Sequence, residues 1–166
     1  MAERKKIVDK LRLTYEGLFS VNELYLVIDK WFRDKGYDKR ENRNVEHVKP
    51  EGKYIELWIQ PWKKITDYAK IDMLIRIIMT DIKEVEVEKD GHTITMNQGK
   101  VQIVIDGFLN TDYENKWEGK PFYVFIRTIF DKFVYKSYTA RFDAQVAEDV
   151  NHLHQTMKSF LNLYRF

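Results

Sequence analysis

The sequence predicts a single α+β domain in which helices cover one face of an antiparallel sheet. Two patterns lead to this prediction. Apolar and polar residues alternate through several segments between Tyr54 and Phe108, as in strands that bury one face. From Pro121 onward the apolar residues instead recur at helical spacing. A sheet with one apolar face must bury that face, and the later helices are its natural cover.

Length and composition indicate one globular domain. The 166 residues suit a single unit over 1–166, in which we expect residues 1–8 to form a flexible tail. Hydrophobic residues make up 44% of the chain and charged residues 33%, which is typical of a folded rather than a disordered protein. Aromatic residues, at 14%, supply large apolar side chains for a core.

Several classes of site are disfavoured by composition. The chain has no cysteine, which excludes disulfides, thiol catalysis and cysteine-ligated metal sites. The charged N-terminus is not followed by an apolar signal region, and no stretch approaches the roughly 18 apolar residues of a membrane span. We therefore expect a soluble, cytoplasmic protein.

The first two predicted elements are a strand and a helix. Lys10 to Tyr15 alternates between apolar and polar side chains, as a half-buried strand does. Ser20 to Glu23 reads Ser-Val-Asn-Glu, the capping-box pattern that begins a helix. Apolar residues then follow at helical spacing, and Gly36 is suited to the left-handed conformation that ends a helix.

The middle of the chain predicts about six strands in a meander. Tyr37 to Gly52 is polar and is expected to be a loop, with at most a weak edge strand at 44–48. The next strand should end at Pro61, which lacks an N–H donor. Asp90-Gly91 predicts a tight hairpin turn, and Asn97 to Gly99 predicts a second turn.

One or two long helices are expected after the sheet. Pro121 to Lys136 has helical spacing, although Phe122 to Phe130 alone also fits a buried strand. A second helix is predicted from about residue 140 to the C-terminus. Its apolar stripe comprises Phe142, Val146, Val150, Leu153, Met157, Phe160, Leu161 and Tyr164.

The titratable residues suggest no complete catalytic or metal site. Glu148 and Asp149 lie one helical turn before His152, so they could share a metal, but a competent site needs three or four ligands. A surface ion pair explains the same spacing. Asp72 and Asp106 lie on strands and could act as a general acid or base if a cavity enclosed them. The alternation instead favours their exposure on the polar side of the sheet.

Four aromatic residues, Trp58, Trp62, Tyr113 and Trp117, lie near lysines and could form a surface. Three interpretations remain open. They could fill a small secondary core, anchor a protein partner, or stack the bases of single-stranded nucleic acid. The net charge of +2 gives no strong field and argues against nucleic acid.

The order of strand, helix, antiparallel strands and long C-terminal helix resembles the helix-grip fold of the START/Bet v 1-like superfamily, which binds hydrophobic ligands. The resemblance spans roughly Lys10 to Tyr164 and involves no short motif. It implies a curved sheet that encloses a cavity against the last helix. The cavity residues would be Ile71, Met73, Ile75, Met96, Ile103, Ile105, Phe142, Val146, Val150 and Met157. The same residues could equally pack against one another as a solid core.

Together these observations favour a binding or interaction domain over an enzyme, with no catalytic residue, cofactor or metal predicted. Its ligand would be a hydrophobic small molecule or a protein partner. A helix-grip enzyme that uses a strand carboxylate, and a protein that binds single-stranded nucleic acid, are the alternatives. The apolar residues outside the main helical stripe leave a homodimer open.

Overall fold

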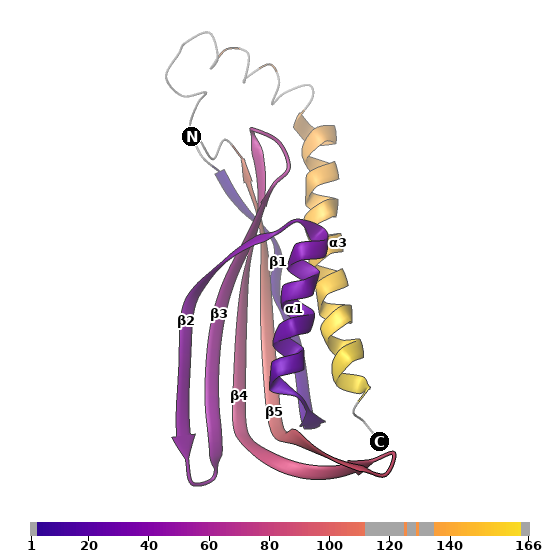
Figure 1. Cartoon of the computed structure of the whole chain (residues 1–166). Coiled ribbons are helices and arrows are strands. Elements are labelled where there is room, and N and C mark those ends of the chain that lie inside the picture. Colours follow the sequence, from indigo (N-terminus) through magenta and orange to yellow (C-terminus); the bar gives the residue numbers. More distant parts are fainter. Residues whose placement is uncertain (1–2, 112–124, 126–128, 130–134, 164–166) are drawn as a thin grey trace.

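The computed structural model describes residues 3–111, 125, 129 and 135–163. It has a five-stranded antiparallel sheet in the order β1-β5-β4-β3-β2. The elements are β1 (Glu3–Phe19), α1 (Val21–Lys35), β2 (Asp38–Lys49), β3 (Gly52–Lys64), β4 (Ala69–Lys89), β5 (His92–Thr111) and α3 (Tyr135–Asn162). The first strand pairs with the last, and α1 carries the chain to the opposite edge of the sheet (Figure 1). The predicted α+β class with an antiparallel sheet is confirmed.

Helix α1 begins and ends where the sequence predicts. Ser20 is its N-cap, and the Ser20 Oγ accepts a hydrogen bond from the Glu23 backbone N–H at 3.3 Å. Gly36 ends the helix in the left-handed conformation at φ 76°, and its N–H bonds back to the Arg33 carbonyl. The buried side chains of α1 are Val21, Leu24, Ile28, Trp31 and Phe32.

The sheet has five strands rather than about six, because β4 and β5 run on where a turn was predicted. Gly99 lies within β5, so the turn predicted at residues 97–99 is wrong. A Cβ on Gly99 would lie 2.5 Å from the Ile82 Cδ1 and 2.9 Å from the Thr80 carbonyl oxygen. The glycine is therefore needed opposite the bulge in β4, where Asp81 has a φ of 56°. The predicted Asp90-Gly91 turn is confirmed, with φ values of 51° and 77°.

Three other boundaries also differ from the predictions. The polar segment 38–49, expected to be a loop, is the edge strand β2, which pairs with β3 although almost all of its side chains are exposed. Backbone hydrogen bonding forms this strand, so no apolar alternation marks it. Pro61 lies inside β3, and the β3–β4 pairing skips residues 60 and 61 before it resumes at Trp62. Residues 3–8, expected to be a tail, form the start of β1.

Helices α1 and α3 cover the same face of the sheet, and the core lies between them and the strands (Figure 1). Helix α3 approaches β5 most closely at Gly107, where a Cβ would lie 2.9 Å from the Val150 Cγ2. The predicted stripe of α3 is confirmed over the described residues. Phe142, Val146, Val150, Leu153, Met157 and Leu161 are buried and Phe160 is partly buried. Tyr164 lies outside the described residues.

Most of the helix predicted at 121–136 also lies outside the described residues. Within it, Phe125 and Ile129 are helical, and residues 135 and 136 belong to α3. Neither α1 nor α3 has a stretch that is long and apolar enough to pass through a lipid bilayer.

Candidate ligand pocket

The ten residues predicted to line a hydrophobic cavity lie in the interior of the protein. All of them are buried, with at most 7% of their surface exposed. Nine belong to one continuous apolar core, and Met96 is buried outside it. The structure therefore brings the sheet and α3 together through these residues. The pocket described next is lined by other side chains.

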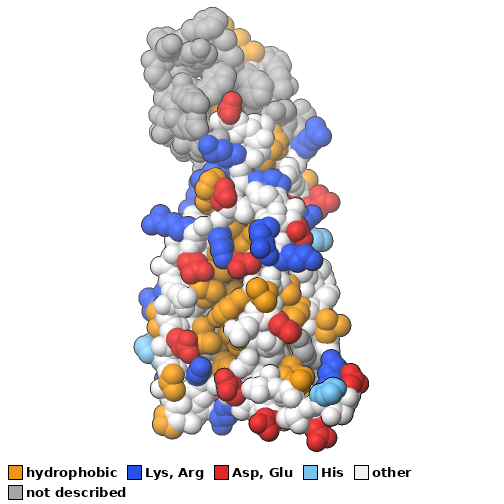
Figure 2. All heavy atoms as spheres, viewed as in Figure 1, with side chains coloured by type: hydrophobic (Ala, Val, Ile, Leu, Met, Phe, Trp, Pro, Cys, Tyr) orange, Lys and Arg blue, Asp and Glu red, His pale blue; other side chains and the backbone are white. Residues whose placement is uncertain are grey.

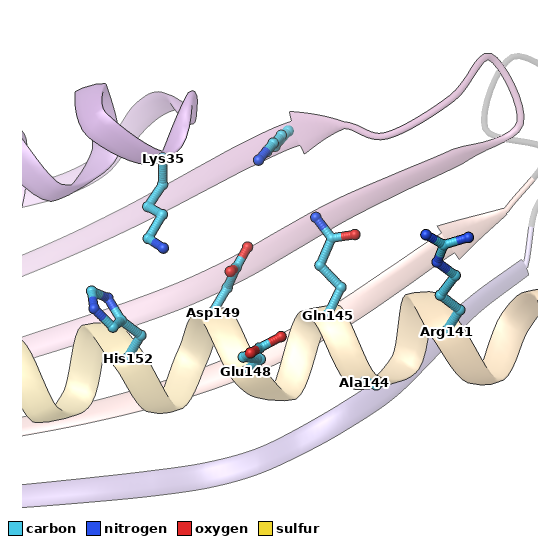
Figure 3. A pocket seen from close by; sticks show the side chains of 8 residues that line it. Lys35, Arg141, Ala144, Gln145, Glu148, Asp149 and His152 are labelled. Carbon is cyan, nitrogen blue, oxygen red and sulfur yellow. The ribbon is translucent and has the colours of Figure 1, made fainter.

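One pocket lies at the rim of this core, between the end of α1, the end of β3 and one flank of α3. Its volume is about 590 Å³. It is lined by Lys35, Lys63, Arg141, Ala144, Gln145, Glu148, Asp149 and His152. Figure 3 shows Arg141, Gln145, Asp149 and His152 along α3, with Lys35 pointing toward them from α1.

Helical spacing explains why these side chains share a flank of α3. Arg141, Gln145, Glu148 and His152 recur at intervals of three or four residues, so they lie one above another. The apolar stripe that begins at Phe142 lies one residue further around the helix and faces the sheet. The same helix thus closes the core with one stripe and lines the pocket with the next.

A buried pair forms part of the pocket wall. The Tyr37 hydroxyl donates a hydrogen bond to the Asp149 Oδ2 at 2.7 Å, and both residues are buried. Burial, and then the hydrogen bond to Asp149 and its negative charge, raises the pKa of Tyr37 far above the usual value of a tyrosine. Tyr37 therefore stays protonated, and Asp149 has one oxygen occupied by it.

Trp31 and His152 make a second fixed contact beside this pair. The Trp31 Nε1–H donates to the His152 Nδ1 at 2.7 Å. Since Nδ1 accepts this bond, it carries no proton, and the neutral ring has its proton on Nε2. The Trp31 ring also stacks on Tyr37, with centroids 5.4 Å apart. The two hydrogen bonds and the stack fix four side chains relative to one another, from α1, α3 and the residue that precedes β2.

The pocket contains more positive than negative side chains, and its cations lack carboxylate partners. Among the described residues, Lys35 and Arg141 form no hydrogen bond or ion pair. The Lys63 Nζ lies 5.6 Å from the centroid of the Tyr37 ring, a cation–π contact. Glu148 is likewise unpaired within the described structure, and Asp149 is bonded to Tyr37. Within the described structure, the three cations thus form no ion pair with a carboxylate, although Glu148 and Asp149 line the same pocket.

Asp72 and Asp106 lie far from this pocket, on the face of the sheet opposite the helices. Both are buried rather than exposed to solvent. The Asp72 Oδ2 lies 3.1 Å from the Arg4 Nη2. Asp106 accepts a 3.1 Å bond from the Arg76 Nη2 and a 2.8 Å bond from the Lys10 backbone N–H. Lys10 has a φ of 50° at a bulge in β1, so Asp106 holds that bulge in place.

The predicted aromatic surface is only partly described. Trp58 and Trp62 lie on the same face as the two aspartates, the face opposite the helices, which we call the open face. Both tryptophans are partly buried. Tyr113 and Trp117 lie outside the described residues. The histidines do not converge, and the described residues contain no group of three or more potential metal ligands. His154, two residues after His152, contacts the Arg12 carbonyl oxygen at 3.0 Å instead.

A smaller groove of about 160 Å³ lies between α1 and the strands β2 and β3. Its floor includes Ile28, Leu57 and Ile59, and the ion pair of Asp29 and Lys39 lies on its rim. Figure 2 shows hydrophobic side chains on this side of the molecule with charged side chains around them. Nothing in the groove indicates a particular occupant.

Sequence reasoning missed most of the pocket. It identified Glu148, Asp149 and His152 but interpreted them as metal ligands or a surface ion pair. The structure instead pairs Asp149 with Tyr37, which precedes β2, and His152 with Trp31 of α1. Trp31 was recognised only as part of the apolar pattern of a helix, since the packing of α1 against α3 is not visible in sequence spacing.

No protein-family model matches the chain, and no curated protein sequence matches it either.

Proposed function

We propose that this protein is a binding domain for a small organic anion, a carboxylate or phosphate compound, held in the pocket between α1 and α3. The observation that carries the proposal is the set of three cations, Lys35, Lys63 and Arg141, around a pocket that contains no ion pair between described residues. An anion in this space would give each cation a partner that the described chain does not supply.

The chemistry of the lining suits such a ligand. Arginine presents a planar fork of donors that binds carboxylates and phosphates in a bidentate manner, and lysine adds a mobile point charge. The His152 Nε2–H is a further donor, because Trp31 occupies Nδ1. Gln145 offers both a donor and an acceptor, which would suit a polar group on the ligand.

The size and rigidity of the pocket also support the proposal. A volume of about 590 Å³ falls within the roughly 300–1,000 Å³ of small-molecule sites. The Tyr37–Asp149 and Trp31–His152 contacts fix the wall before any ligand arrives, which reduces the entropy lost on binding. The pocket is lined mostly by charged and polar side chains, so the proposed ligand is polar rather than hydrophobic.

Isothermal titration calorimetry with citrate and glycerol 3-phosphate tests this function. We expect one of these anions to bind the wild-type protein. The variant Arg141→Gln should weaken that binding about 10-fold, since a hydrogen bond to a charged group is worth roughly 1.5–3 kcal/mol. Lys35→Gln should weaken it by a similar factor.

Lys30→Gln is the matched control, since Lys30 is an exposed lysine of α1 that does not line the pocket. It should leave the affinity unchanged. If neither anion binds, or if Lys30→Gln weakens binding as much as Lys35→Gln does, the proposed function is wrong.

A further inference from the structure

We propose that the face of the sheet opposite the helices binds single-stranded nucleic acid. This second site is independent of the pocket and uses different residues. Because side chains alternate along a strand, the residues that pair across the sheet from Arg76 and Asp72 share this face. None of the described helices lies on it, since α1 and α3 both pack on the other side.

Four aromatic rings are spread over this face: Tyr54, Trp58, Trp62 and Phe108. All four are partly exposed. Trp58 and Trp62 are four residues apart on β3, which corresponds to about 13 Å along the strand. Phe108 lies two strands away, directly across from Asp72 on β4. The rings therefore form a platform with more than one place for a base to stack.

Each of the four rings has a cation close to it. The Arg43 guanidinium lies 5.8 Å from the centroid of Trp58, and the Lys70 Nζ lies 5.1 Å from that of Trp62. The remaining contacts are Lys49 with Tyr54 at 5.7 Å, Arg4 with Phe108 at 3.8 Å and Lys6 with Phe108 at 5.5 Å. Cations interleaved with aromatic rings are the arrangement that binds both the phosphates and the bases of a single strand.

Cations outnumber carboxylates around the rings of this face. There are six cations, Arg4, Lys6, Arg43, Lys49, Lys70 and Arg76, and five carboxylates, Asp9, Asp38, Glu56, Asp72 and Asp106. Four of the cations are in ion pairs, Arg4 with Asp72, Arg43 with Glu56, Arg76 with Asp106, and Lys6 with Asp9 and Asp106. The net charge of +2 argued against nucleic acid, but it does not reveal that the fold gathers cations on one side.

Two unpaired donors add to the positive character of this face. The Trp58 Nε1 and the Arg76 Nε are buried and have no hydrogen-bond acceptor in the described structure. The two residues face each other across β3 and β4. Both donors belong to this face, where N–H dipoles without an acceptor favour a negative charge over a positive one.

The energies allow a base to displace the cation at a ring. A cation–π contact at an exposed site is worth about 0.5–1 kcal/mol, whereas stacking of a base on an aromatic side chain is worth about 1–3 kcal/mol. Arg4 and Arg43 have half-exposed side chains, at 50% and 51%, but each is also in an ion pair, with Asp72 and Glu56 respectively. A phosphate would bind beside these ion pairs or compete with their carboxylates, so the stacking of the base supplies the main gain in binding energy.

A lipid surface fits this face less well. Proteins that lie on membranes bury an apolar surface about 5–10 Å into the headgroup region. Here the rings are partly buried between neighbouring strands, and the buried Asp72 with its partners Arg4 and Gln60 interrupts the apolar surface. Among the residues that the structure describes, this face offers partly buried ring surfaces, which suit stacking better than insertion into a lipid layer.

Fluorescence anisotropy with labelled 12-nucleotide oligo-dT and oligo-U tests the proposal on the full chain. We expect binding that weakens as salt rises, with a slope of log affinity against log salt near −0.7 per phosphate contacted. Trp62→Ala should weaken binding about 10-fold through the lost stacking. The double variant Arg43→Gln/Lys49→Gln, on the exposed edge strand, should reduce the size of the slope by about 1.4.

Controls separate this site from the pocket and from folding. Lys35→Gln/Arg141→Gln should bind the oligonucleotides like the wild type, because these residues lie on the other side of the sheet. If Trp62→Ala fails to melt cooperatively, the double variant Arg43→Gln/Lys49→Gln decides whether this face binds the oligonucleotides. Absence of binding at low salt, or an unchanged slope in that variant, would overturn the proposal. It would be equally overturned if anionic phosphatidylserine vesicles or polyglutamate bound this face as tightly as the oligonucleotides did.

Discussion

The two faces of the sheet are made by the same strands but differ in nearly every property. On the face under α1 and α3, alternate residues of β4 such as Ile71, Met73 and Ile75 have no exposed surface. On the opposite face, the intervening residues include Asp72, Leu74 and Arg76, and they pair with charged or aromatic neighbours. A single-residue shift along the strand thus separates a closed apolar core from a polar, aromatic surface.

The helix-covered face stabilises the fold, whereas the proposed binding sites lie elsewhere on the molecule. The predicted cavity residues on the helix-covered face are buried within the described structure, whereas the rim and the other face present side chains that a ligand could reach. The rim provides a pocket whose three cations form no ion pair with the described residues, and the open face provides aromatic rings with cations beside them. Substitutions on the two faces should therefore affect different measurements.

The largest expected effect comes from two isoleucines on opposite faces of β4. Ile75 is fully buried under the helices and Ile78 is partly exposed on the open face. Ile75→Ala should lower the free energy of unfolding by about 2–5 kcal/mol, through lost burial and a cavity. Ile78→Ala should cost about 1 kcal/mol, in proportion to its smaller buried area. Urea denaturation measures both, and equal losses would mean that the open face is also a core.

Among the ion pairs on the open face, the more buried pairs should contribute more to the free energy of unfolding. Asp106→Asn removes the negative charge that neutralises Arg76 and Lys6, and it weakens the hold on the β1 bulge. Because both cations are partly exposed, we expect a loss of about 2 kcal/mol rather than the roughly 3–5 kcal/mol of a fully buried pair. The more exposed pair of Glu56 and Arg43 is the comparison, and Glu56→Gln should cost less than about 1 kcal/mol.

The buried Tyr37 should make stability fall in alkaline solution. Its pKa is raised in the folded protein, so the folded state keeps a proton that the unfolded state loses above about pH 10. Its contribution is therefore complete below pH 10 and lost as the pH rises further, at about 1.4 kcal/mol per pH unit. Tyr37→Phe should flatten the stability curve above pH 10 relative to the wild type, while costing about 1 kcal/mol at pH 7.

Tyr25 and Tyr54 also have raised pKa values, so only the difference between wild type and variant isolates Tyr37. Denaturant unfolding at pH 7, 9, 10 and 11 supplies that difference. Parallel curves for the two proteins would show that Tyr37 ionises normally in the folded state.

The smallest expected effect on stability belongs to the pocket cations. Lys35→Gln and Arg141→Gln remove side chains that form no hydrogen bond or ion pair with the described residues. Each should change the free energy of unfolding by less than about 0.5 kcal/mol, as surface substitutions generally do. A decrease in the free energy of unfolding above about 1 kcal/mol would show that these cations stabilise the fold and are not available to a ligand.

Sequence patterns predicted those parts of the fold that depend on local chemistry. The Ser20 cap, the Gly36 end, the Asp90-Gly91 turn and the apolar stripe of α3 all follow from neighbouring residues. The edge strand β2 could not be predicted, because backbone pairing with β3 forms it without any apolar pattern. Gly99 was misread as a turn because its close contact with Ile82 exists only after the strands pair.

The candidate sites were less predictable for the same reason. Asp149 and His152 were visible as titratable residues, but their partners Tyr37 and Trp31 are more than 100 positions away in the sequence. On the open face, Trp58 and Trp62 were recognised as a pair, whereas Phe108 joins them only through the register of β4 and β5. Long-range pairing, and not local pattern, assembles both surfaces.

The most direct test of the proposed pocket is a titration of the ¹⁵N-labelled protein with citrate or glycerol 3-phosphate, followed through its amide spectra. The pocket predicts saturable shifts at Lys35, Lys63, Gln145 and His152, and no saturable shifts at Trp58, Trp62 or Phe108 on the opposite face. The central claim is contradicted if the shifts appear only on that opposite face or if the pocket amides do not move.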